Sequence, residues 1–87
     1  MTTGERIGEV IHFYGKIEVA VLRLSNNLKI GDMIHFLGSH TDFQQEVTSM
    51  QIEHEPVAEG KAGEEIAIKV IERARKGDAI FLITDAE

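Results

Sequence analysis

The sequence predicts an all-β fold, a small closed antiparallel barrel of six or seven short strands. Three observations predict it. A strand-like run from Thr48 stops at the only proline, Pro56, and resumes beyond a Gly-Lys-Ala-Gly turn at residues 60–63. This stretch lies between two copies of a Gly-Asp turn. Short apolar segments recur between turn signals, and closure would remove sheet edges that an 87-residue domain could not otherwise protect.

Length and composition limit the chain to one domain with one small core. We expect a single unit over residues 1–87 with frayed ends at 1–5 and 84–87, since a domain of this size hides only about 60–65% of its unfolded surface. The absence of cysteine excludes disulfides and thiolate metal sites. The polar N-terminus lacks a signal-peptide pattern, and no run approaches the roughly 18 apolar residues of a membrane span. We therefore expect a cytoplasmic protein without membrane contacts.

The charge is acidic and unevenly distributed. Fifteen acidic and nine basic residues give a net charge of −6. Residues 46–87 hold ten acids and five bases, against five acids and four bases in residues 1–45. This excess opposes non-specific attraction to phosphate backbones, so we expect no binding to DNA.

The first two predicted strands form a hairpin. Residues 7–14 are rich in β-branched and aromatic side chains, and residues 17–24 alternate between apolar and other side chains. Gly15-Lys16 makes a tight break between them. The adjacent apolar pair Val21-Leu22 shifts the apolar face by one residue and predicts a bulge.

The middle of the chain predicts two further strand regions. Residues 28–38 contain a Gly-Asp turn that leads into an apolar strand, and residues 39–42 form a polar loop. Residues 43–54 predict one long strand that bends across a barrel corner, with Met50 and Ile52 pointing inward.

Residues 64–76 fit two patterns. Ala67, Val70, Ile71 and Ala74 lie at helical spacing, and Gly77 would suit a helix C-terminus. Yet apolar β-branched residues also alternate here, which favours a strand. We predict a strand because a second Gly-Asp turn follows.

Glycine and aspartate define the predicted turns. Residues 29–37 are echoed by residues 75–83, each with a Gly-Asp pair that starts an apolar strand. Glycine allows a positive φ, and aspartate accepts hydrogen bonds from the amides of its own turn. The predicted structural turn residues are Gly31, Asp32, Gly60, Gly63, Gly77 and Asp78.

No residue pattern predicts catalysis, a metal or a cofactor. The four histidines are His12, His35, His40 and His54, and no two have a metal-ligand spacing. Residues 39–42 include serine, histidine and aspartate, but adjacency in a loop does not indicate a triad, because triad members meet through the fold. Neither Gly-Lys pair, at Gly15 or Gly60, is followed by the Ser or Thr of a phosphate-binding loop. We expect a protein that is not an enzyme.

The turns and the central strand carry a family resemblance. The motifs are residues 28–32, 48–51, 59–64 and 76–78, in this order. Together they resemble the second domain of translational GTPases of the elongation factor Tu type, without the GTPase domain. The resemblance implies a six-stranded Greek-key barrel, and in elongation factor Tu this domain helps to hold the aminoacylated end of tRNA.

The resemblance and the charge pattern each suggest binding residues. Gln51 falls where elongation factor Tu has a glutamate that contacts the terminal adenosine, whereas Glu53 and His54 replace an aromatic residue and an arginine of that factor. A second group is a basic patch near the last turn, which could meet an RNA backbone or an acidic partner. The candidate ligand-binding residues are Gln51, His54, Lys69, Arg73, Arg75 and Lys76.

Three functions are compatible with these observations. The first is a non-catalytic binding module that contacts RNA, the ribosome or a translation-related protein. The second is an accessory barrel that partners an RNA-modifying enzyme or an enzyme of the collagenase-like peptidase family. The third is a self-associating structural domain; the sequence does not indicate an oligomeric state.

Overall fold

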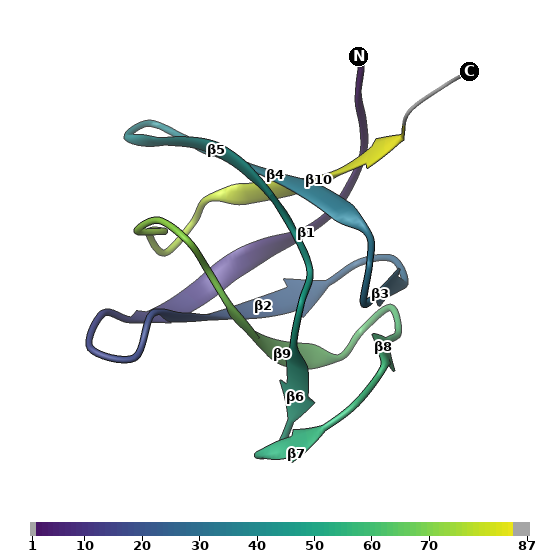
Figure 1. Ribbon diagram of the computed structural model, residues 1–87. Helices are drawn as coiled ribbons and strands as arrows, with labels where there is room; N and C mark the ends of the chain where they lie inside the picture. Colours follow the sequence, from purple (N-terminus) through teal and green to yellow (C-terminus); the bar gives the residue numbers. More distant parts are fainter. Residues whose placement is uncertain (1, 85–87) are drawn as a thin grey trace.

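Short segments with alternating buried and exposed side chains form the strands of this protein (Figure 1). A computed structural model of the chain describes residues 2–84, with side chains for residues 4–83. Within this part every regular element is a strand, so the predicted all-β class is confirmed. The strands are β1 (Thr2–Tyr14), β2 (Val19–Leu24), β3 (Leu28–Lys29), β4 (Met33–Gly38), β5 (Thr41–Glu46), β6 (Met50–Ile52), β7 (Glu55–Pro56), β8 (Glu59–Gly60), β9 (Glu65–Lys69) and β10 (Ala79–Thr84).

One antiparallel sheet makes up most of the molecule. Its strand order is β5-β4-β10-β1-β2-β9-β6-β7, and β3 pairs with β8 in a separate two-stranded sheet. The large sheet curls around a single core (Figure 1), but its ladder is open, with β5 and β7 at its edges. The predicted closed, six-stranded Greek-key barrel is therefore not confirmed.

A buried side chain bridges the gap between the edge strand β5 and the chain after β9. The Gln45 amide donates to the Lys69 carbonyl oxygen at 2.8 Å, and its oxygen accepts from the Ile71 N–H at 2.8 Å. These are the two bonds that a neighbouring strand would otherwise supply. The Gln45 side chain thus makes the hydrogen bonds that a paired strand would make, which explains why a polar residue is buried here.

The core consists of the inward side chains of all the longer strands. Phe36 and Phe43 stack at its centre, with ring centroids 4.6 Å apart. Burial of such apolar surface is the main stabilising force in a chain without cross-links. The buried apolar residues are Ile7, Val10, Ala20, Leu22, Leu24, Leu28, Ile34, Phe36, Phe43, Val47, Met50, Ile66, Ile68, Val70, Ala74 and Ile80.

The bulge of the first hairpin lies in β1, whereas the sequence predicted it in β2 at Val21-Leu22. In β2, Ala20, Leu22 and Leu24 are buried in regular alternation, so the Val21-Leu22 pair contains no bulge. The extra residue lies in β1, where Val10 pairs with Leu22 and His12 with Val21. An apolar pair on neighbouring positions therefore marks a strand that is apolar on both faces, not a shift of register.

The predicted long strand over residues 43–54 is divided into β5 and β6. Between them, the Val47 N–H donates to the Asp32 carbonyl oxygen at 2.8 Å, and the Val47 carbonyl oxygen accepts from the Gly31 N–H at 2.9 Å. These bonds take the backbone of Val47 out of the sheet ladder. Met50 is buried as predicted, whereas Ile52 is only partly buried.

Residues 64–76 contain strand β9, as predicted, and not a helix. β9 pairs with β2 on one side and with β6 on the other. Ile66 and Ile68 point into the core. These alternating β-branched residues therefore fit a central strand, despite the competing helical spacing.

The structure contains three copies of one turn, at residues 29–32, 61–64 and 75–78, which we call the docked turns. In each, the N–H of the fourth residue donates to the carbonyl oxygen of the first, over 3.0 to 3.1 Å. The carboxylate of the fourth residue accepts from the N–H of the first, over 2.7 to 3.0 Å. The third residue is glycine with a φ of +99°, +91° or +96°, a conformation that a Cβ would strain.

Each docked turn is held against one buried residue of another segment: Val47 between β5 and β6, Leu24 in β2 or Val10 in β1. The N–H of the turn glycine donates to the carbonyl oxygen of this buried residue. The N–H of the buried residue donates in return to the carbonyl oxygen of the fourth turn residue. Three positions after each glycine comes a buried isoleucine, namely Ile34, Ile66 or Ile80. The sequence predicted turns at all three places, but it recognised only the two copies with aspartate as a repeat.

Gly60 has a role other than the predicted turn. It lies in β8, where a Cβ would stand 2.9 Å from Ile66 Cγ2 and 2.9 Å from Leu24 Cδ1. Glycine is needed here because the backbone approaches the core closely.

The two ends of the described chain lie side by side (Figure 1). Thr2 pairs with Thr84, and Thr3 with Ile83. Residues 2–5, which were predicted to fray, therefore belong to β1, and residues 85–87 lie outside the described part. In the described residues there is no helix of a length and hydrophobicity that could span a bilayer.

Candidate binding surfaces

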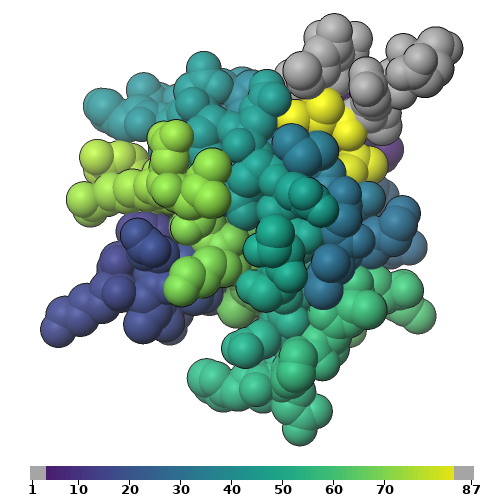
Figure 2. Space-filling view, viewed as in Figure 1, coloured from purple at the N-terminus to yellow at the C-terminus, as the bar shows by residue number. Residues whose placement is uncertain are grey.

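An open groove lies on the outer face of the sheet, across β2, β9 and β6. Its volume is about 620 Å³. The β1–β2 loop forms one side and the β6–β7 turn the other, and both project from the body of the molecule (Figure 2). We call this hollow the outer groove. Its lining residues are Tyr14, Ile17, Val19, Val21, Gln51, Ile52, Glu53, His54, Gly63, Glu64, Glu65, Ile66 and Ala67.

Strand register explains why apolar side chains line the outer groove. Val21 pairs with Ala67, and Ala67 pairs with Gln51, so these three form a row across the outer face. Tyr14, which pairs with Val19, and Ile17 are exposed to 48% and 57%. β2 is thus apolar on both faces, a pattern typical of strands that are covered on both sides. The adjacent apolar residues Val21 and Leu22 were the sequence signal for the groove, but they were interpreted as a bulge.

The charged residues that line the outer groove are acidic. Glu65 pairs with Arg23 at 3.1 Å, and Glu64 accepts from the Lys61 N–H at 2.7 Å within its docked turn. Glu53, in contrast, takes part in no ion pair among residues 4–83. No lysine or arginine is among the lining residues. The groove therefore combines an apolar floor with two carboxylates, Glu53 and Glu64, that form no ion pair among residues 4–83.

Backbone strain is concentrated beside the outer groove. Among the described residues, the non-glycine residues with positive φ are Glu18 (57°), Glu53 (50°) and His54 (67°). Glu18 ends the β1–β2 loop, and the other two form the β6–β7 turn. Two-residue hairpin turns of this kind usually contain Asn-Gly or Asp-Gly, because longer side chains disfavour positive φ. Such strain persists where the surrounding structure fixes it, often at functional sites.

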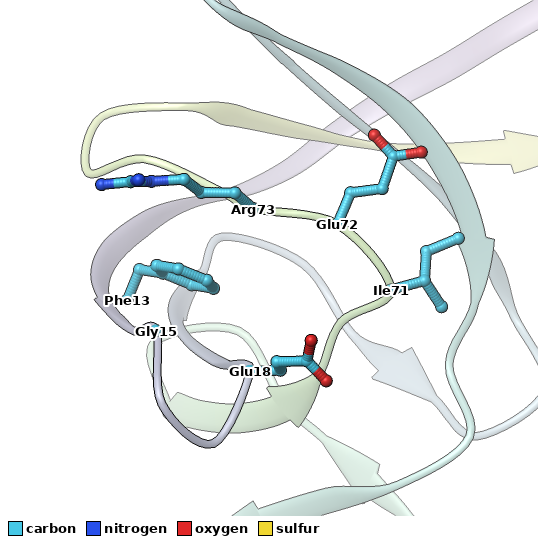
Figure 3. A pocket seen from close by; sticks show the side chains of 6 residues that line it. All are labelled: Phe13, Gly15, Glu18, Ile71, Glu72 and Arg73. Atoms are coloured by element: carbon cyan, nitrogen blue, oxygen red, sulfur yellow. The ribbon is translucent and has the colours of Figure 1, made fainter.

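A second hollow, of about 460 Å³, lies at the mouth of the curled sheet (Figure 3). Phe13, at the end of β1, projects into the space between the β1–β2 loop and residues 71–73. Ile71 is 67% exposed. Glu72 and Arg73 point in different directions (Figure 3), so the charges at this hollow do not converge on one position.

The outer face of β4 and β10 is a third exposed apolar surface. Cross-strand pairs are Met33 with Ile83, His35 with Phe81, and Leu37 with Ala79. Met33 and Leu37 are each 40% exposed. We call Met33, Leu37, Ala79, Phe81 and Ile83 the β4–β10 face. It adjoins β1, the strand that pairs with β10 in the interior of the sheet.

The structure separates the predicted ligand-binding residues. Gln51 and His54 line the outer groove. Lys69 lies opposite Val19, at the end of the groove, and Arg73 lines the mouth hollow. Arg75 and Lys76 are exposed in the docked turn at residues 75–78. All four residues of the predicted basic patch are exposed, and their role in binding stays a prediction.

The histidines have separate environments. His35 in β4 has its Nε2 atom 2.6 Å from the Oδ1 atom of the exposed Asp42 in the neighbouring strand β5. The His12 and Tyr14 rings are in contact, with centroids 4.3 Å apart. Within the described residues, no three histidine or acidic side chains are grouped in a way that could hold a metal ion.

The chain is similar in sequence to a curated protein and in fold to solved structures. No protein-family model matches the chain. The chain is 41% identical over 80 residues to an uncharacterized protease, MJ0090, of Methanocaldococcus jannaschii. The match covers 91% of this chain but only 20% of the protease, so the chain spans about a fifth of that relative's length.

Two solved structures share the fold. Both show the C-terminal domain of a protein assigned to the U32 peptidases in Geobacillus thermoleovorans. One has a TM-score of 0.87 over 97% of this chain and 98% of that chain, at 18% identity. The other, a selenomethionine variant, has a TM-score of 0.85 over 88% of this chain and 98% of that chain, at 18% identity.

The predicted resemblance to the elongation factor Tu second domain is therefore wrong. The matches are to a protease and to C-terminal domains assigned to the U32 peptidases, and the translation-factor function is not supported. The motifs behind that resemblance are largely the docked turns. These motifs therefore reflect the backbone bonds of the turns to their buried neighbours.

Proposed function

We propose that this chain is an accessory, non-catalytic domain that works with a peptidase of the U32 kind by binding to its catalytic part. The observation that carries the proposal is the 41% identity with a protease over 80 residues. The same fold in two C-terminal domains assigned to the U32 peptidases supports it. Among the functions compatible with the sequence, this is the accessory barrel of a collagenase-like peptidase.

The β4–β10 face is the surface that we propose for this contact. It carries exposed methionine and leucine side chains next to partly exposed Phe81 and Ile83. Contiguous exposed apolar side chains are typical of protein interfaces. The face also adjoins the paired strands β1 and β10, where a preceding domain in a longer protein would connect to β1. A domain joined there would lie close to this face.

Binding to a purified full-length U32 peptidase from the same organism tests the proposal. We expect saturable binding by isothermal titration calorimetry, and a loss of about tenfold in affinity when Met33 and Leu37 are both replaced by serine, since exposed apolar anchors carry much of an interface's energy. The matched control is the double variant Ile17→Ser and Ile71→Ser, which removes exposed apolar side chains elsewhere and should bind as the parent does.

Sedimentation of the chain alone separates this function from self-association. A concentration-dependent dimer that the Met33 and Leu37 replacements dissociate, together with no binding to the peptidase, would favour the self-associating structural domain. Peptidase binding with equal affinity for the variant and the parent would reject the β4–β10 face but not the complex.

A further inference from the structure

We infer that the outer groove binds a short extended peptide segment in which an apolar side chain is flanked by lysine or arginine. The choice of a peptide as the ligand rests on the proposed function, because a peptidase acts on peptides. The groove itself is distinct from the β4–β10 face, since it lies over β2, β9 and β6.

The floor of the outer groove fits an apolar side chain. Val19, Val21 and Ala67 form it, and Tyr14 and Ile17 stand exposed beside it. Tyrosine offers a large contact area with few rotatable bonds, so little side-chain entropy is lost when it becomes covered. A ligand side chain between Tyr14 and Ile52 would cover apolar surface that now faces water.

The charges of the outer groove fit a cation. Glu65 is paired with the side chain of Arg23, and Glu64 accepts the backbone N–H of Lys61. Neither Glu53 nor Glu64 has an ion-pair partner among residues 4–83. Phosphate groups would be repelled by these carboxylates, which disfavours nucleic acids and anionic lipid headgroups as ligands. A lysine or arginine next to the apolar side chain would instead find Glu53 at the groove wall.

The geometry of the β6–β7 turn supports a fixed site. Glu53 and His54 both adopt positive φ, which holds their side chains on the wall of the outer groove. The turn is short and closes the β6–β7 pair of Ile52 with Glu55. A carboxylate on such a constrained turn loses less freedom on binding than one on a flexible loop.

Fluorescence anisotropy with labelled octapeptides tests the inference on the isolated chain. The probes alternate leucine with lysine, leucine with glutamate, or serine with lysine. We expect saturable binding of the leucine–lysine probe alone, and weakening as salt is added because the Glu53 contact is exposed. Glu53→Lys should lower the affinity for this probe about fivefold. Ile17→Ser should lower it by a similar factor.

Matched controls make the result specific to the outer groove. Glu46→Lys and Ile30→Ser change exposed residues of the same types outside it and should leave the affinity unchanged. Tyr14→Ser serves as a second groove variant, and circular dichroism shows that each variant is folded. The inference is overturned if the leucine–lysine probe does not bind, if the leucine–glutamate probe binds equally well, or if the groove variants behave like the controls.

The outcome is independent of the peptidase complex. Loss of peptide binding with an intact peptidase complex would reject the groove and keep the proposed function. Peptide binding without a peptidase complex would reject the docking contact and keep the groove.

Discussion

The docked turns at residues 75–78 and 29–32 make the same bonds in different surroundings. Asp78 is buried, and a Cβ on Gly38 would collide with its carboxylate, so the strand β4 covers it closely. Asp32 is partly exposed and lies 3.6 Å from Lys29 Nζ. The third copy has the exposed Glu64. One hydrogen-bond pattern thus occurs at three degrees of burial, and burial should decide its contribution to stability.

The largest effect is expected for Asp78→Ala. Its carboxylate accepts from the Arg75 N–H at 2.7 Å, and truncation leaves that donor without a partner in a covered site. We expect a loss of about 2–3 kcal/mol in the free energy of unfolding. Urea denaturation followed by circular dichroism measures it, and Lys76→Ala in the same turn is the control. Asp78→Glu should be nearly as damaging because Gly38 leaves no room, and full stability of that variant would contradict the close packing.

A smaller effect is expected for Asp32→Ala. The Lys29 N–H loses its acceptor at 3.0 Å, but water can replace it because the turn is partly exposed. The expected loss is about 1 kcal/mol. The same urea titration measures it, and a loss equal to that of Asp78→Ala would show that burial does not distinguish the two turns.

The smallest effect is expected for Glu64→Ala. The Lys61 N–H that it accepts from at 2.7 Å is exposed, so the loss should be about 0.5 kcal/mol or less. Glu64→Asp should fold normally, since a shorter carboxylate occupies this position in the other two docked turns. A destabilisation above that of Asp32→Ala would reverse the expected order.

The sequence predicted the parts of the fold that local chemistry determines. Alternation identified β9, and the Gly-Asp pairs identified two docked turns, with positive φ at glycine, and the apolar strands β4 and β10 that follow them. The division between β5 and β6 could not be predicted, because it depends on the bonds of Val47 to a turn that lies 15 or more residues earlier. The open ladder likewise depends on Gln45, which in sequence is an ordinary polar strand residue.

The candidate binding surfaces were less predictable. Gln51 and His54 were singled out by analogy and do lie in the outer groove, but Tyr14 and Ile17 were not recognised. Tyr14 and Ile17 line the outer groove only because folding brings β1, β2, β9 and β6 together. The basic residues Arg73 and Lys76 are both exposed, and their part in binding stays a prediction.

The pairing of Thr2 with Thr84 has a practical consequence for protein engineering. Because entry and exit points are adjacent, the domain can be spliced into a surface loop of a host protein without stretching that loop. Circular permutants that join these points with a short linker and open at the β1–β2 loop should retain the sheet order. The domain is therefore suited to insertion into different host proteins.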